Sequence, residues 1–183
     1  MADIAPATRP RIERGEILKI LADHGVASSL PALVGIRGYY RDTMGEPGAN
    51  DRGIYDDGIA FISHEAFVTF NGNVDPSVFR PGIATLVPGV WRYKIGIHGL
   101  SRPKAQQYKA LVQAGPVLVA RDGQGFDRGW FGINIHRGGV NGTSSLGCQT
   151  IVPDQWPAFI ALVEQEMKRA GVSELNYVLT AKP

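Results

Sequence analysis

Short apolar runs, rich in β-branched and aromatic residues, fill much of the chain from residue 59 onward. Each run is bounded by Gly, Pro, Asn or Asp, which are the residues that favour turns. Segments of this length and composition are typical of strands, and residues 91–97 also alternate apolar with polar or small residues. The expected strands cover 59–63, 66–71, 90–98, 116–121, 130–136, 149–152 and 175–180.

Helical spacing of apolar residues is confined to a few segments. Residues 13–24 and 154–170 each carry an apolar stripe and are followed by a glycine, so we expect helices there. A second short helix is expected over 28–34. The sequence therefore predicts a mainly β (α+β) fold with a β-sandwich or barrel-like core and a few peripheral helices. Residues 1–35 form an N-terminal tail and helical segment in this prediction, and 36–183 form the main domain of one compact unit.

Residues 35–58 are rich in Gly, Asp, Asn, Arg and Tyr, and they predict a long loop. Asp51, Asp56, Asp57 and Asp75 invite a metal-site interpretation. Their spacing does not match a calcium loop, and their neighbours favour turns. We therefore expect no metal and no other cofactor.

Composition limits the class of function. A net charge of +2 without a basic stripe argues against nucleic acid as a partner. No apolar run reaches the length of a membrane span, and the first residues do not resemble a secretory signal. We expect a monomer that is synthesised in the cytoplasm and that reaches any target outside by release or export.

Cys148 is the only cysteine, which excludes an internal disulfide and any zinc site with several cysteines. His136 lies at the end of one expected strand, and Cys148 lies at the start of the next. A thiol attacks as a thiolate, so it needs a nearby base or positive charge. The sequence predicts that Cys148 is a nucleophile with a lowered pKa and that His136 is its base.

The surrounding loop supplies further candidate site residues. Backbone amides around Ser145, Leu146 and Gly147 are candidates for the donors that stabilise an oxyanion. Arg137 and Ser144 are candidates for substrate binding. His98 also ends an expected strand, so it is a second candidate for substrate binding and a rival to His136 as the base.

These residues resemble the L,D-transpeptidase catalytic domain, the YkuD-like family. The resemblance rests on a strand-end histidine in 135–139, a Gly-rich stretch, and the Ser-Leu-Gly-Cys-Gln run of 145–149, and it covers about residues 90–152. Leu146 stands where the family usually has histidine, and the loop from histidine to cysteine is short. The arrangement is similar to compact versions from phages and prophages, in which 36–183 would be the catalytic domain.

The resemblance implies an enzyme that acts on peptidoglycan stem peptides in the periplasmic cell wall. It would form a thioester at a bond following meso-diaminopimelate, and would then release the acyl group to water or to an amine. The replaced histidine and the absent signal favour hydrolysis, as in a lytic enzyme. Two alternatives stay open: another cysteine amidase or peptidase, and a non-catalytic module that binds the cell wall or serves in a virion.

Overall fold

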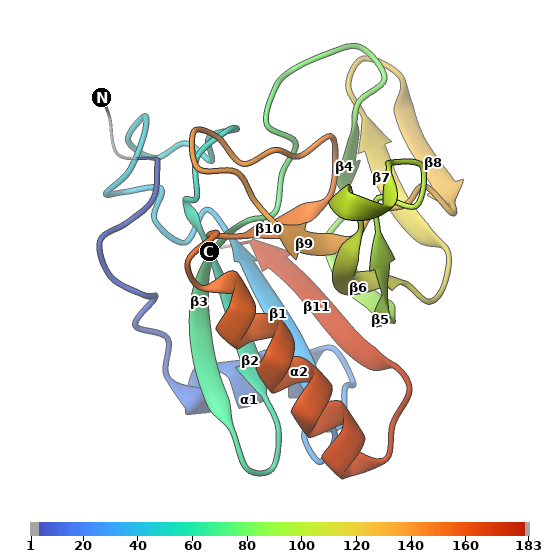
Figure 1. Cartoon of the computed structure of the whole chain (residues 1–183). Helices are drawn as coiled ribbons and strands as arrows, with labels where there is room; N and C mark the ends of the chain where they lie inside the picture. Colours follow the sequence, from blue (N-terminus) through green and yellow to red (C-terminus); the bar gives the residue numbers. More distant parts are fainter. Residues whose placement is uncertain (1–3, 182–183) are drawn as a thin grey trace.

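The computed structural model describes residues 4–181, and it is built around one closed, mixed β-barrel (Figure 1). The strand order around the barrel is β1-β11-β5-β6-β9-β10-β3-β2. The pairs β1–β11 and β9–β10 are parallel, and the others are antiparallel. The barrel strands are β1 (Ala32–Arg37), β2 (Asp57–Ile62), β3 (Phe67–Asn73), β5 (Gly89–His98), β6 (Tyr108–Gln113), β9 (Ile135–Arg137), β10 (Gln149–Ile151) and β11 (Leu175–Ala181). The expectation of a mainly β, barrel-like fold is confirmed.

A smaller antiparallel sheet stands beside the barrel, at the upper right of Figure 1. It contains β4 (Ala84–Leu86), β7 (Val117–Arg121) and β8 (Gly125–Gly129), with β7 in the middle. A short 3₁₀ turn, η1 (Lys104–Gln106), lies between β5 and β6. Of the three strands in this sheet, only β7 was expected, and β4 and β8 were missed. The barrel strand β6 and the turn η1 were also missed.

The two expected long helices are present, as α1 (Arg14–Asp23) and α2 (Trp156–Ala170). Helix α1 buries Ile17 and Leu21 in an apolar cluster with β1 and β2. Helix α2 packs Phe159 edge-on against Phe70 of β3, with ring centroids 5.1 Å apart. Within residues 4–181, no helix is both long and apolar enough to cross a bilayer.

The expected helix over 28–34 is wrong, because residues 32–37 form strand β1 between β2 and β11. Leu33 packs in the apolar cluster that includes α2, whereas Val34 packs in the cluster that includes α1. A strand with both faces buried shows no alternation of apolar and polar residues, so its pattern does not separate it from a helix. The boundary expected at residue 35 falls inside this strand.

The strand expected over 130–136 is also largely wrong, because only Ile135–Arg137 belong to β9. The preceding residues are held by a side chain instead of a strand ladder. Gln113 Oε1 accepts hydrogen bonds from the amides of Phe131 and Ile133, at 3.1 and 2.8 Å. Gly132 between them has a φ of 69°, which takes the chain out of the extended conformation.

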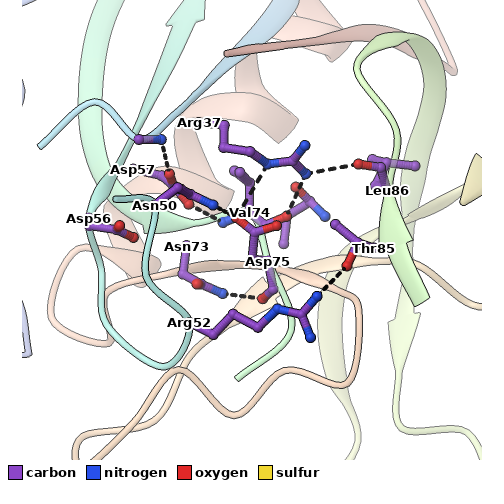
Figure 2. Close-up of polar contacts among 12 residues, drawn as sticks. Arg37, Asn50, Arg52, Asp56, Asp57, Asn73, Val74, Asp75, Thr85 and Leu86 are labelled. Atoms are coloured by element: carbon purple, nitrogen blue, oxygen red, sulfur yellow. Dashed lines mark hydrogen bonds and ion pairs between the residues drawn. The ribbon is translucent and has the colours of Figure 1, made fainter. Parts of the chain in front are cut away.

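A buried polar cluster links the long loop 38–56 to the barrel (Figure 2). Asp57 accepts hydrogen bonds from the amides of Gly38 and Val74, at 2.5 and 2.6 Å. Asp75 accepts a hydrogen bond from Asn50 and forms an ion pair with Arg37, at 3.3 Å. The cluster therefore ties the loop, β1, β2 and the end of β3 together.

Burial disfavours the ionised form of two acids in this cluster. Burial raises the pKa of Asp56 to about 6, and the charges of Asp75 and Asp51 add to the effect. Burial, followed by the charges of Asp75 and Asp56, also raises the pKa of Asp57. The fold consequently favours the protonated form of both carboxyl groups.

We expect the protein to become more stable as the pH falls from about 8 to about 5.5. A carboxyl group with a raised folded-state pKa contributes stability at low pH, and that stability is lost as the pH rises through about 6, the value for Asp56. Asp56→Asn should raise the melting temperature at pH 8 and flatten this dependence, whereas the exposed Glu46→Gln should leave it unchanged. A melting temperature that falls steadily between pH 8 and 5.5 would contradict the assignment.

Candidate active site

The parallel pairing of β9 with β10 brings His136 and Cys148 close together in the barrel wall. His136 lies opposite Thr150, and Cys148 precedes Thr150 by two residues. Side chains two residues apart point to the same face, and adjacent strands lie about 4.8 Å apart with a rise of about 3.3 Å per residue. The Cα atoms of His136 and Cys148 are therefore roughly 8 Å apart, which is within reach of an imidazole and a thiol that lean together.

In this structure the thiol is directed to the segment that precedes β9. Cys148 Sγ accepts a hydrogen bond from the amide of Asn134 and donates one to the carbonyl of Gly132, both at 3.4 Å. Within residues 4–181, no hydrogen bond joins Sγ to His136. Catalysis by this pair would require Sγ to turn from Gly132 O towards the imidazole.

His136 is held in one tautomer by its neighbour in sequence. Its Nδ1 atom lies 2.7 Å from the carbonyl oxygen of Arg137, and 3.3 Å from the hydroxyl of Tyr108. A carbonyl can only accept, so Nδ1 carries the proton. The unprotonated Nε2 atom is then the basic nitrogen of this side chain.

His98, at the end of β5, stacks on His136. The two ring centroids are 4.1 Å apart, with an angle of 22° between the rings. His98 Nδ1 lies 3.2 Å from the side-chain amide nitrogen of Asn134, which donates to it. That contact places the proton of His98 on Nε2, so His98 is poorly suited to be the base and His136 is favoured.

Burial keeps both members of the pair neutral. Desolvation, followed by the charge of His98, lowers the pKa of His136 to about 4. Desolvation also lowers the pKa of His98. Burial raises the pKa of the Cys148 thiol, although the Asn134 amide partly opposes this effect. The lowered thiol pKa expected from the sequence is therefore wrong for this state, which holds a thiol and a neutral imidazole.

Hydroxyl groups fix the loop that leads to Cys148. Ser145 Oγ donates to the carbonyl of Cys148 at 2.6 Å and accepts from the amide of Gly147 at 3.0 Å. Ser77 exchanges two hydrogen bonds with the backbone of Ser145, and its hydroxyl lies 2.6 Å from that of Thr143. Because the Gly147 amide is engaged by Ser145, it is not free to bind an oxyanion in this state.

Gly147 is required by the close approach of β4. It has a φ of 129°, and a Cβ atom at this position would lie 2.5 Å from the carbonyl oxygen of Ala84. Any side chain here would push the loop away from the small sheet. Leu146 before it is 63% exposed, so this part of the loop faces solvent.

An open cavity of about 400 Å³ lies against the two stacked histidines. Its walls include seven side chains that carry polar or charged groups: His98, Arg102, Gln106, Tyr108, His136, Arg137 and Ser144. Ser144 has a φ of 56°, a conformation that is uncommon outside glycine. Cys148 itself does not line the cavity. Of the two members of the pair, only His136 contacts it.

The structure brings most of the predicted site residues into one neighbourhood. His136, His98, Arg137 and Ser144 line one cavity, and Cys148 follows the loop fixed by Ser145. Sequence reasoning missed Asn134, Tyr108, Arg102 and Ser77. Only Asn134 left a signal, because it shares the strand face of His136 in the alternation of 131–136.

The acids considered as metal ligands are engaged elsewhere. Asp57 and Asp75 bind backbone amides, Asn50 and Arg37, as described for the buried cluster. Within residues 4–181, no three His, Cys, Asp or Glu side chains gather in a group that could hold a metal ion.

Comparison with known proteins adds no relative: no family model, no curated protein and no solved structure matches this chain.

The neutral state of Cys148 can be measured by alkylation with iodoacetamide. Since only the thiolate reacts, a thiol with a raised pKa should react about tenfold faster for each pH unit between roughly 6 and 9. Glutathione serves as the reference thiol, and Cys148→Ser should take up no label. A rate that is already constant at neutral pH would show a preformed thiolate and would contradict the neutral pair.

Proposed function

We propose that this chain is a cysteine-dependent hydrolase or L,D-transpeptidase of peptidoglycan stem peptides, acting at a bond that follows meso-diaminopimelate. The observation that carries the chemistry is the parallel register that sets Cys148 close to His136, whose unprotonated Nε2 atom can act as a base and whose ring lines an open cavity. The substrate class is supported by the sequence resemblance described above. We also propose that it acts in the periplasmic cell wall and that it originates from a phage or prophage.

The first step forms a thioester. Substrate displaces the Cys148 thiol from Gly132 O, and Sγ attacks the carbonyl carbon while its proton moves to His136 Nε2. The carbonyl π electrons move to oxygen and give a tetrahedral intermediate. Arg137 O stabilises the imidazolium that forms, because it accepts the hydrogen bond from Nδ1.

The intermediate then collapses towards products. The C–N bond breaks, and His136 Nε2–H gives its proton to the leaving amine. Water, or an acceptor amine, next loses a proton to the same nitrogen as it attacks the thioester carbon. The C–S bond breaks, and the proton returns to sulfur, which restores the neutral pair.

The oxyanion needs donors other than the Gly147 amide, since Ser145 Oγ already binds it. We assign this role to the backbone amide of Cys148, which lies next to the nucleophilic sulfur. The hydroxyl network of Ser145, Ser77 and Thr143 would then act by holding that amide in place.

Hydrolysis is favoured over transfer in this proposal. Both reactions share one thioester, and they differ in whether water or an amine reaches it. The cavity beside His136 is open and its lining is mainly polar, and Leu146, two residues before Cys148, is exposed. Water therefore has ready access to the acyl group.

Three single variants test the assignment of roles. Cys148→Ala should abolish turnover, and His136→Ala should lower kcat/KM by roughly 10²–10⁴, the usual contribution of a general base. His98→Ala should cost less, since its Nδ1 atom is engaged by Asn134. Melting temperatures serve as the control for folding, and retained turnover in Cys148→Ala would exclude the mechanism.

The pH profile supplies an independent readout of the base. Protonated His136 cannot accept the thiol proton, so the acidic limb of kcat/KM should lie near its pKa of about 4.

The reaction itself is read from product masses. Incubation with tetrapeptide and cross-linked muropeptides should give shortened stems or separated monomers that have gained one water. New cross-links or exchanged terminal residues as the sole products would identify a transpeptidase instead. Cleavage of the glycan strand or of the amide to muramic acid would show that the substrate bond is wrong, and unchanged muropeptides would favour a non-catalytic module.

A further inference from the structure

The cavity beside His136 is positively charged. Arg102, four residues after His98, and Arg137, directly after His136, both line it, and its lining contains no Asp or Glu. Arg102 belongs to the connection between β5 and β6, whereas Arg137 ends β9. Two guanidinium groups thus share one cavity of about 400 Å³.

Neither guanidinium is neutralised by the protein. Several other arginines have a carboxylate partner, including Arg37 with Asp75, Arg52 with Asp122 and Arg121 with Asp127. Within residues 4–181, Arg102 and Arg137 form no ion pair. Because arginine is the side chain best shaped to bind a carboxylate through two parallel hydrogen bonds, an unpaired couple beside a nucleophile suggests a ligand.

The guanidinium of Arg137 and the backbone of Arg102 are positioned before any ligand arrives. The guanidinium of Arg137 lies over the ring of Tyr108, 5.2 Å from its centroid. The backbone of Arg102 is fixed by a hydrogen bond from its amide to Gly99 O, at 2.8 Å, and by one from Gln107 Nε2 to its carbonyl, at 2.9 Å. Preorganisation of this kind lowers the entropic cost of binding.

The positive charge of Arg102 affects the pKa of both stacked histidines. Arg102 contributes to the lowered pKa of both His98 and His136, after the larger effect of burial. An anion bound between the two arginines would offset this contribution. Anion binding and the basicity of His136 are therefore linked.

We propose that Arg102 and Arg137 bind a carboxylate of the peptide substrate next to the scissile bond, and that they select acyl donors that carry a free acid there. This inference rests on the proposed function and specifies the chemistry of its substrate. Two groups of a stem tetrapeptide could supply the carboxylate: the side-chain acid of meso-diaminopimelate, and the terminal acid of the leaving residue.

The kinetic test compares three synthetic tetrapeptides that end in meso-diaminopimelyl-D-alanine. One is unmodified, one carries an amide in place of the side-chain acid, and one carries an amide at the C-terminus. Arg102→Gln and Arg137→Gln should each raise KM for the unmodified peptide by roughly 10- to 100-fold, the usual worth of a charged hydrogen bond. For the amidated peptide that lacks the recognised acid, the same variants should leave KM unchanged. That peptide identifies which of the two carboxylates the arginines bind.

Two further variants act as controls. Arg102→Lys keeps the charge and should recover part of the lost affinity. Arg128→Gln removes an exposed arginine of β8 that lies outside the cavity lining, and it should behave as the parent. Equal loss for all three peptides, or equal loss in Arg128→Gln, would overturn the proposal.

A binding measurement separates failure of this inference from failure of the proposed function. Calorimetry with Cys148→Ala, which keeps both arginines, should show binding of the unmodified peptide that weakens when Arg102→Gln is added. If Cys148→Ala retains turnover but arginine-dependent binding persists, the mechanism fails and the carboxylate site stands. If turnover requires Cys148 but binding is insensitive to both arginines, the carboxylate site fails and the mechanism stands.

Discussion

The parallel pairing of β9 with β10 is the constraint on which the candidate site depends. It sets His136 level with Thr150, and Cys148 stands two residues before Thr150. A parallel pair cannot be closed by a tight turn, so residues 138–148 must fold back over the barrel end. Tyr55 holds this excursion through a hydrogen bond to Gly139 O at 2.7 Å, and Gly138 makes room for it, since a Cβ there would lie 2.0 Å from the tyrosine hydroxyl.

The same loop is anchored from its other end by segments far away in the sequence. Ser77 binds Ser145 and Thr143, and it follows directly on the buried cluster around Asp75. That cluster in turn holds the loop 38–56 against the barrel. The position of Cys148 therefore depends on hydrogen bonds that extend from the loop 138–148 to β1 and β2, and not only on its own strand.

Local pattern predicted those parts of the protein whose environment differs between two faces. Helices α1 and α2 and strand β5 have a buried side and a solvent side, so their periodicity was readable. Strand β1 is buried on both faces, and the residues before β9 are held by Gln113, so neither showed the expected pattern. Cys148 and His136 could be proposed as a pair because they lie close in sequence. Tyr108 and Arg102 come close to them only through the β5–β6–β9 neighbourhood, which no local signal encodes.

Burial favours the neutral form of both members of the pair, and the charges of the nearby arginines add to the lowered pKa of His136. A free imidazole with a pKa of about 4 is a weak base for a thiol whose own pKa is raised. A carboxylate held by Arg102 and Arg137 would remove part of the repulsion that disfavours the imidazolium, and linkage requires that the same carboxylate bind more tightly when His136 is protonated. In the proposed mechanism the imidazolium would form only as the thiol attacks, so this added binding would be realised in the transition state and not in the unliganded protein. Interactions of that kind raise kcat, which means that an acidic group on the substrate would contribute to the reaction as well as to its selection.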